Sequence, residues 1–402
     1  MNFIELLKKK GTGPTMSKSL WGTDFLTLES GFHSSEISLT TKATMFTALL
    51  TLPPNPEEAK WLQTAIAFLP TELQAFLSPS KELFLGLTQK AIRHENLSES
   101  EFILALDFLF DPKTPEYLKG AFLEAERLKR ETLVENNACY EYFWNKSQRW
   151  ETKVPVLVDL SLAYDGMNRH PLIALLVAPL LASVGIPCVL HGLDDVAPKK
   201  GINPFKILKA AGKNPLRNPL EDIENPDIGW GYIDQSLSFP ELYALKKMRS
   251  DMVKRPILAT MEKLLQPIRA KNGNLLVTGY THPPYKDMLF NVLRTHNHSP
   301  QFLILRGQEG SIQLPLDRRA PFAHSDGSSD YVRPPKEYPK TEPDRDITVE
   351  ESLEAGLKAL HQDGMERDYL SYLAQVIIEK FNLRPNSNFD FHKALNHWDN
   401  LK

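Results

Sequence analysis

Short polar and cationic side chains gather in a loop that follows a β-rich segment, residues 154–160. The loop reads Leu162-Ala-Tyr-Asp-Gly-Met-Asn-Arg169. Gly166 would let the backbone approach a ligand closely, and Asp165 supplies a short polar group. Arg169 can form two parallel hydrogen bonds to a phosphate or carboxylate. The loop is therefore a candidate anion site, although a plain turn between a strand and a helix uses the same residue types.

A second candidate loop is His191-Gly-Leu-Asp-Asp-Val-Ala-Pro-Lys-Lys-Gly201. Its Lys199 and Lys200 precede Asn203-Pro204, which predicts the start of a helix with asparagine as the N-cap. The amide groups at a helix N-terminus attract anions, so lysines beside them favour an anion site. His191 stands at a strand end, where an imidazole can donate a hydrogen bond or carry a proton. A solvated basic loop and a structural histidine are the alternatives.

Other reactive patterns give weaker signals. His296-Asn-His298 offers two imidazoles without a carboxylate close by in the sequence. Two such ligands alone rarely hold a metal ion, so we predict no metal site. The Gly-x-Ser-x-Gly motif is absent, and serine hydrolase chemistry therefore has no support.

The two candidate loops belong to a region with the pattern of a parallel sheet. Four β-rich runs, at 154–160, 186–191, 274–279 and 301–306, are separated by helix-like stretches. Strand, helix and strand in this order form βαβ units, whose ligands bind beyond the carboxyl ends of the strands. We therefore predict an α/β domain with a mainly parallel sheet over residues 151–402.

Residues 1–150 have mainly helical patterns, which predicts an N-terminal helical domain. Ser98 or Ser100 would cap one of its helices. In the second half, residues 316–346 are rich in Pro, Asp, Arg, Gly and Ser, which predicts a long loop. Thr348-Val-Glu-Glu351 then matches a capping box at the start of another helix.

The composition is that of an ordinary globular protein. The 402 residues carry a formal net charge of -3, so no global basic field points to nucleic acid. Cys139 and Cys188 are the two cysteines of the sequence, which fits a reducing compartment, and we expect a cytoplasmic protein. Residues 171–190 carry no charge, but prolines interrupt them. A buried helix followed by a strand is therefore preferred over a membrane span.

Seven short segments, in this order along the chain, resemble glycosyltransferase family 3, which includes anthranilate phosphoribosyltransferase. The resemblance covers the stretch from about 97 to 381 and is closest to a divergent anthranilate phosphoribosyltransferase-like branch; residues 21–95 would then be an insertion. The segments are Gly120-Ala-Phe-Leu123 with Arg127-Leu-Lys-Arg-Glu-Thr132, Tyr164-Asp-Gly-Met-Asn-Arg169, Gly185-Ile-Pro-Cys-Val-Leu-His-Gly192, Phe239-Pro240 with Tyr243 and Arg249, Lys254-Arg-Pro-Ile-Leu-Ala-Thr260, Gly279-Tyr-Thr-His-Pro-Pro284 and Arg306-Gly-Gln-Glu-Gly-Ser311.

The resemblance implies both an architecture and a reaction. The architecture is a small helical domain beside a larger α/β domain, with the substrate cleft between them and a homodimer formed through helices. Residues 235–260 are candidates to pack on the helical domain. Active members transfer phosphoribosyl from phosphoribosyl pyrophosphate (PRPP). They hold the pyrophosphate on a Gly-Thr-Gly-Gly-Asp loop and an Asn-x-Ser-Thr segment, and magnesium on an Asp-Glu pair.

This sequence departs from the family pattern at each of these points. The glycine-rich loop reads Ala163-Tyr-Asp-Gly-Met167, apolar residues stand at 173–176, Leu190 replaces a lysine, and Ile312-Gln313 replaces the acidic pair. Isoleucine and glutamine cannot balance the charge that develops on departing pyrophosphate. Magnesium is therefore expected only if transferase activity survives.

The positions that contact the aromatic acid in active relatives are partly kept, as His191, Tyr243 and Arg249. Our leading hypothesis is a degraded phosphoribosyltransferase that binds an anionic, phosphate-bearing small molecule or nucleic acid in the cleft. The alternative is an active enzyme with an anthranilate-like acceptor, and the third is a scaffold without a small ligand. No catalytic residue is assigned. The expected ligand-binding residues are Tyr164, Asp165, Gly166, Arg169, His191, Gly192, Lys199, Lys200, Tyr243, Arg249 and Arg255.

Overall fold

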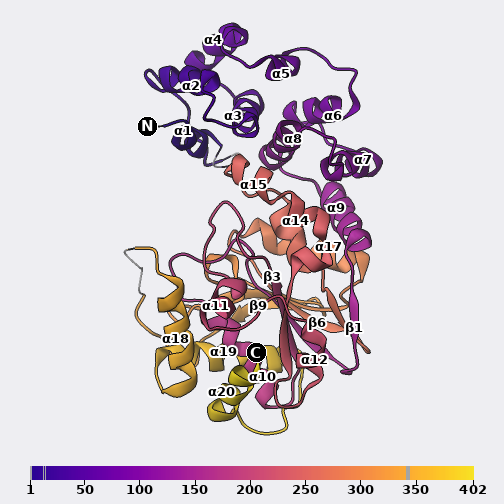
Figure 1. The fold of residues 1–402 in the computed structure, drawn as a ribbon, viewed down its shortest axis with the longest axis vertical. Helices are drawn as coiled ribbons and strands as arrows, with labels where there is room; N and C mark the ends of the chain where they lie inside the picture. The colour runs from indigo at the N-terminus through magenta and orange to yellow at the C-terminus, as the bar shows by residue number, and fades with distance from the viewer. Residues whose placement is uncertain (1, 12, 14, 341–344) are drawn as a thin grey trace. The chain divides into compact units, whose positions relative to one another are not determined.

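A mixed, mostly parallel sheet organises the second half of the chain in the computed structural model (Figure 1). The structure describes residues 2–11, 13, 15–340 and 345–402. The chain divides into two compact units. The first unit is Met1–Tyr142 with Glu241–Thr260, and the second is Phe143–Pro240 with Met261–Lys402.

Apolar, β-rich segments form the sheet of the second unit. Its strands in the described residues lie in the order β4-β3-β2-β6-β7-β8-β9, and the pairs from β4 to β7 are parallel. Strands β2, β3, β4 and β6 are buried along their whole length, as expected for strands covered on both faces. The predicted α/β class with a mainly parallel sheet is confirmed. The strands are β2 (Leu157–Ser161), β3 (Cys188–Gly192), β4 (Trp230–Asp234), β6 (Asn274–Gly279), β7 (Gln301–Leu305), β8 (Ala320–His324) and β9 (Ser329–Val332).

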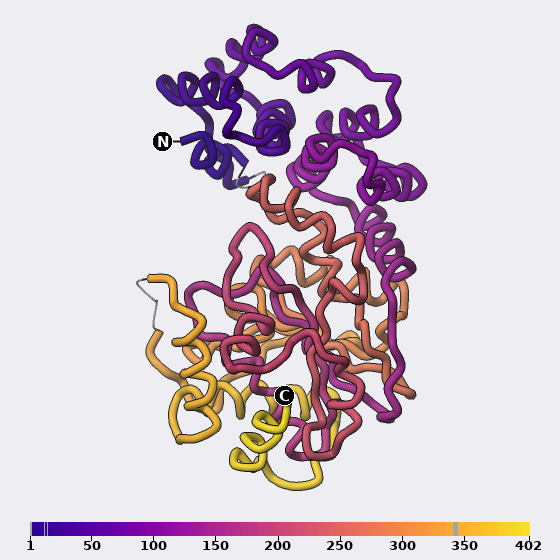
Figure 2. The backbone as a smooth tube through the Cα atoms, viewed as in Figure 1, coloured from indigo at the N-terminus to yellow at the C-terminus, as the bar shows by residue number. Residues whose placement is uncertain are grey.

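One face of the sheet packs against the C-terminal helices, drawn in gold and yellow in Figures 1 and 2. Every second strand residue points to this side, among them Val158, Leu160 and Leu190. Trp230 anchors the layer: its indole stacks on Trp398 with ring centroids 5.7 Å apart. The elements of this layer are η3 (Ile173–Leu176), α10 (Val177–Ser183), α11 (Pro204–Ala210), α18 (Val349–His361), α19 (Met365–Lys380) and α20 (Phe391–Asn400).

The opposite face carries the alternate strand residues, including Leu157 and Val189. They pack with Ile223 of α12 (Pro219–Glu224) and Ile268 of β5. Phe302 of β7 meets Phe290 of α17 (Pro284–His296) edge to face. Strand β5 (Ile268–Ala270) pairs in parallel with β1 (Trp150–Thr152) in a small second sheet. Short helices complete the unit: α13 (Gln235–Ser238), η4 (Glu262–Leu264) and η5 (Gln308–Gly310).

The long loop expected over residues 316–346 is wrong over part of its length, because β8 and β9 form an antiparallel hairpin there. Its turn uses Gly327 in the left-handed region (φ 92°), and Asp326 accepts a hydrogen bond from the Ser328 amide at 2.7 Å. Pro, Asp and Gly residues, which made the sequence look like a loop, thus shape the hairpin turn and its edges. Residues 341–344 of the expected loop lie outside the described residues.

The first unit consists of helices. Its caps follow from the sequence: Ser98 accepts a hydrogen bond from the Glu101 amide in a complete capping box, as predicted for one of the two serines. A cluster of aromatic rings, including Phe32 stacked on Trp61 with centroids 5.9 Å apart, fills part of its core. The helices are α1 (Phe3–Lys10), α2 (Asp24–His33), α3 (Leu39–Thr51), α4 (Pro56–Thr64), η1 (Ala65–Ala67), α5 (Thr71–Gln74), η2 (Ala75–Leu77), α6 (Leu83–Ile92), α7 (Glu99–Phe110), α8 (Glu116–Lys129) and α15 (Lys246–Met252), with α9 (Leu133–Lys146), α14 (Pro240–Ala244) and α16 (Leu258–Met261) at the unit boundaries.

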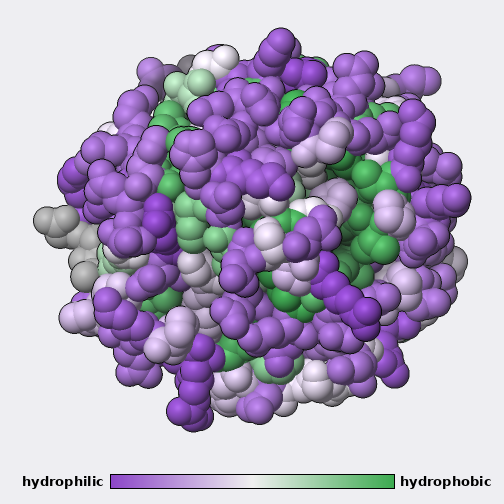
Figure 3. Space-filling view, turned by 90° about the horizontal axis from the view of Figure 1, so that it is seen from below, coloured by the Kyte–Doolittle hydropathy of each residue, from purple (hydrophilic) through white to green (hydrophobic). Residues whose placement is uncertain are grey.

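The uncharged stretch 171–190 forms η3, α10 and β3 rather than one long helix. None of the helices in the described part of the chain has both the length and the apolar content needed to cross a bilayer. The face drawn in Figure 3 is mainly hydrophilic, with hydrophobic side chains visible in patches between polar ones.

A buried cluster of charges lies inside the first unit. Lys129 donates to both carboxylate oxygens of Glu135 at 2.7 Å, while the fully buried Glu126 lies 3.1 Å from the same ammonium group. Neither oxygen of Glu126 makes a hydrogen bond within the described residues. Burial, and after it the negative charge of Glu135, raise the pKa of Glu126 to about 8. The Lys129 ammonium group thus lies beside two carboxylates but donates its hydrogen bonds to Glu135, which leaves the charge of Glu126 poorly compensated.

We predict that Glu126→Gln stabilises the protein increasingly as the pH rises. The pKa of Glu126 is raised in the folded protein from 4.5 to about 8, so folding loses stability as the pH rises through this interval. The amide cannot ionise and escapes that loss. The difference in the free energy of unfolding between variant and wild type, from urea titrations at pH 5, 7 and 9, should therefore grow with pH. Glu36→Gln removes a charge from an exposed site and serves as the control. Equal pH trends for the two variants would contradict the prediction.

Candidate functional site

The carboxyl ends of β2 and β3 carry a buried chain of polar side chains. The Tyr164 hydroxyl donates to Nδ1 of His191, and Nε2 of His191 donates to Asp159 Oδ1 at 3.0 Å. All three side chains are buried. Burial, and after it the charge of Glu262, raise the pKa of Tyr164, so its hydroxyl keeps the proton that it donates. The structure thus brings the predicted residues Tyr164 and His191 together, within the protein interior.

Backbone contacts join the two predicted loops. Met167 and Ile202 exchange two hydrogen bonds of 2.8 Å, and the Gly201 amide donates to the Asp165 carbonyl at 2.9 Å. Gly166 adopts φ +80°, and a Cβ there would lie 2.4 Å from the carbonyl carbon of Gly201. The glycine is required because the second loop passes directly over it.

The helix start predicted at Asn203-Pro204 is confirmed. The Asn203 side chain accepts from the Lys206 amide at 3.0 Å and also donates to the Leu193 carbonyl at 2.9 Å, which ties the loop to the helix. Lys199 turns back toward the first loop, whereas Lys200 is exposed and lies 4.0 Å from Asp195. Gly192, the other predicted glycine, is buried against Tyr232.

A third loop, residues 306–311 after β7, contributes a carboxylate that contacts the first two loops. Glu309 Oε1 accepts from the backbone amides of Arg169 at 2.9 Å and His170 at 3.2 Å, and Oε2 accepts from the Asn168 amide at 3.1 Å. His170 Nδ1 donates to Oε1 at 3.2 Å, and Lys199 Nζ donates to Oε2 at 2.9 Å. Burial opposes ionisation here, but the hydrogen bonds from His170 and Lys199 and the charge of Lys199 outweigh it and hold the pKa of Glu309 far below its ordinary range.

A pocket of about 580 Å³ opens beside this carboxylate. Its described lining residues include four arginines and one lysine against two carboxylates. Arg306 donates from Nε to the Thr281 carbonyl at 3.2 Å, Arg318 pairs with Asp317 at 2.7 Å, and Arg319 lies over the Tyr331 ring at 4.1 Å. These arginines and Arg169 are exposed. The pocket can therefore offer several guanidinium groups to an anion.

Three predicted residues belong to the first unit and not to the unit that holds this pocket. Arg249 is a buried residue of α15, Tyr243 is half-buried with Lys246 Nζ 5.1 Å from its ring centroid, and Arg255 is exposed.

The residues at the position of the family's acidic pair do not fit a magnesium ion. Ile312 is fully buried in the core of the second unit. The Gln313 amide accepts from the Ala174 amide at 2.9 Å and donates to the Pro171 carbonyl at 2.9 Å and to Gln308 Oε1 at 2.8 Å. These contacts make Gln313 a brace between loops, and no carboxylate stands at either position.

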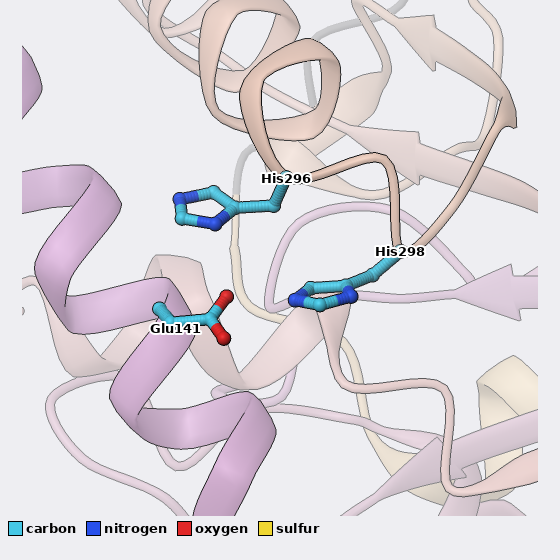
Figure 4. A group of neighbouring side chains, drawn as sticks. All are labelled: Glu141, His296 and His298. Atoms are coloured by element: carbon cyan, nitrogen blue, oxygen red, sulfur yellow. The ribbon is translucent and has the colours of Figure 1, made fainter.

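Figure 4 shows the two histidines of the weak metal signal, together with Glu141. The rings of His296 and His298 stack with centroids 5.8 Å apart, and His298 also stacks on Trp144 at 4.3 Å. Glu141 belongs to the first unit, and the two histidines belong to the second.

Sequence reasoning missed Glu309, His170 and three pocket arginines, Arg306, Arg318 and Arg319, as site residues. A signal was present, because Arg306-Gly-Gln-Glu-Gly-Ser311 places a glutamate between glycines directly after a strand. That position is the carboxyl end of a parallel strand, where the other two loops were expected to bind anions.

Known proteins resemble this chain in sequence. The chain is 27% identical over 303 residues to an uncharacterized protein of Aquifex aeolicus (strain VF5), which covers 73% of this chain and 91% of that protein. It is 28% identical over 227 residues to the anthranilate phosphoribosyltransferase of Acetivibrio thermocellus, which covers 56% of this chain and 64%, just under two thirds, of that enzyme. No family model matches the chain.

Solved structures share the fold. Anthranilate phosphoribosyltransferase from Thermus thermophilus gives a TM-score of 0.60 at 18% identity, covering 78% of this chain and 94% of that one. The Saccharomyces cerevisiae enzyme in complex with PRPP and Mg gives 0.59 at 14% identity, covering 80% and 94%. At these identities the likeness establishes the fold alone.

We predict that Gly166→Ala destabilises the protein far more than Gly212→Ala does. Both glycines have positive φ, +80° and +73°, but a Cβ at Gly212 meets nothing within 4 Å. The backbone penalty alone should cost Gly212→Ala about 1 kcal/mol, and overlap with Gly201 should cost Gly166→Ala about 1–3 kcal/mol more. Urea unfolding of both variants measures the difference. Equal losses would mean that the second loop does not press on Gly166.

Proposed function

The chain has the anthranilate phosphoribosyltransferase-like fold of glycosyltransferase family 3, and from that premise we propose that it binds a phosphate-bearing ligand in the arginine-lined pocket of its second unit. The observation that carries the proposal is the charge of this pocket. Arg169, Arg306, Arg318 and Arg319 line it, while the carboxylate of Glu309 is compensated by its own five donors. Guanidinium groups bind phosphate oxygens in pairs, which favours phosphate over a neutral ligand.

The size of the pocket favours a small molecule over a polymer. A volume of about 580 Å³ lies within the range of about 300–1,000 Å³ typical of small-molecule sites. The aromatic rings of Tyr331, Tyr338 and Tyr369 add apolar surface beside the arginines. A nucleotide-sized ligand would use both kinds of surface. Single-stranded nucleic acid, which needs a longer basic groove, is the second class to test.

Catalytic transfer of phosphoribosyl is less well supported. Departure of pyrophosphate needs a cation or preorganised donors at the leaving group. Ile312 and Gln313 supply no carboxylate for magnesium, and Gln313 is engaged with Ala174, Pro171 and Gln308. Pyrophosphate release from PRPP in the presence of anthranilate by the purified protein would favour this alternative.

We predict that the double variant Arg306→Ala/Arg318→Ala binds inorganic pyrophosphate and ADP about 30- to 700-fold more weakly than wild type. Each guanidinium lost removes a charge-assisted contact worth roughly 1–2 kcal/mol, and 1.4 kcal/mol is tenfold in affinity. Isothermal titration calorimetry at fixed salt gives the dissociation constants.

Arg384→Ala is the matched control, because Arg384 is exposed in the same unit and does not line the pocket. Wild type that binds neither pyrophosphate nor ADP would overturn the proposal, and so would an equal loss in Arg384→Ala. If wild type binds a single-stranded oligonucleotide tightly and the double variant does not, the ligand is nucleic acid and not a small molecule.

A further inference from the structure

The contacts of Glu309 have the form of a protein–phosphate contact. Three consecutive backbone amides, those of Asn168, Arg169 and His170, donate to one carboxylate at 2.9–3.2 Å. Lys199 Nζ and His170 Nδ1 add two side-chain donors at 2.9 and 3.2 Å. Successive amides with a lysine are a donor set that recurs in phosphate sites. Here the anion that they hold belongs to the chain itself.

The third loop is shaped to deliver this carboxylate. Glu309 has φ 50°, in the left-handed region that residues with a side chain rarely adopt. Gly310 follows at φ 84°, and at Gly307 a Cβ would lie 1.9 Å from the Ser311 carbonyl oxygen. Lys263 Nζ donates to the Gly310 carbonyl at 3.2 Å, which stabilises the turn. The backbone thus accepts an unfavourable conformation that points Glu309 at the amides.

The donor set borders the pocket. Arg169, His170 and Glu309 all line it, and the Glu309 side chain is 14% exposed. A phosphate group that enters beside Arg306 therefore lies next to the carboxylate and can compete with it for the same amides. The two anions repel each other, so they cannot share the site.

We propose that the amides of residues 168–170, with His170 and Lys199, form a phosphate subsite that Glu309 occupies as an internal competitor. Its ligand is the terminal phosphate or diphosphate group of the compound bound in the pocket, so the inference rests on the proposed function. The carboxylate must leave before this group can bind. Apparent affinity is then reduced by the fraction of molecules in which Glu309 is bound to the amides.

The test compares Glu309→Ala and Glu309→Gln with Asp317→Asn, using inorganic pyrophosphate as the probe. Asp317 is the other carboxylate of the described pocket lining, so Asp317→Asn removes the same charge without vacating the amides. If Glu309 occupies the subsite in 90–99% of molecules, Glu309→Ala binds pyrophosphate about 10- to 100-fold more tightly than wild type. Asp317→Asn should gain less than about threefold, from weaker repulsion and from the release of Arg318 from its exposed ion pair. Glu309→Gln keeps the side-chain shape and should fall between them.

Hydrogen exchange of a peptide that spans residues 165–172 supplies a second readout. In wild type the amides of residues 168–170 are hydrogen-bonded to Glu309 and should exchange slowly. In Glu309→Ala they should exchange rapidly, and pyrophosphate should restore their protection. If Glu309→Ala does not fold, Glu309→Gln replaces it, with an intermediate loss of protection, because its side-chain oxygen can still accept from these amides.

The outcomes separate the two proposals. Binding that depends on Arg306 and Arg318 but is no tighter in either Glu309 variant than in Asp317→Asn would overturn the internal competitor and leave the proposed function standing. If Glu309→Ala binds pyrophosphate more tightly but the bound pyrophosphate does not slow exchange at the amides of residues 168–170, the proposed location of the subsite would be overturned. Absence of binding in wild type and in all variants would overturn both proposals.

Discussion

The carboxylate of Glu309 is the interaction on which the arrangement of the candidate site depends. It connects three loops that leave the carboxyl edge of the sheet: 162–170 after β2, 193–203 after β3 and 306–311 after β7. A mostly buried charge is costly unless hydrogen bonds replace its hydration, and five nitrogen donors do so here. Without this ion the first two loops would still be joined by backbone hydrogen bonds such as those between Met167 and Ile202, but the third loop would lose its contacts with Lys199 and with the amides of residues 168–170.

The same interaction explains how a chain with a net charge of -3 presents a cationic pocket. Glu309 lies among the lining residues, but hydrogen bonds from the amides of residues 168–170 and from Lys199 compensate its negative charge. The exposed guanidinium groups of Arg169 and Arg306 therefore determine the local field more than the overall charge does. Local arrangement, and not composition, makes the pocket suitable for an anion.

Local patterns in the sequence predicted most of the fold. Alternating and continuous apolar runs located β2, β3, β6 and β7, and the caps at Ser98, Asn203 and Thr348 were readable because each involves residues only three positions apart. Strands β1, β4 and β5 and the β8-β9 hairpin were missed, the hairpin because its Pro, Asp and Gly residues are typical of loops.

The site was less predictable for a physical reason. The rule that ligands bind at the carboxyl ends of parallel strands located the correct edge of the sheet. However, Glu309 contacts the Arg169 amide across 140 residues of sequence, and no local pattern encodes that contact.

Since the carboxylate of Glu309 is tethered to the site by the chain itself, its effective concentration there is high, and a simple anion in solution competes poorly with it. A ligand can displace it only with additional contacts, such as pairs of hydrogen bonds to Arg306 or Arg318. In the proposed phosphate subsite, the internal carboxylate would therefore select for ligands that carry several anionic oxygens, with a diphosphate favoured over a single phosphate.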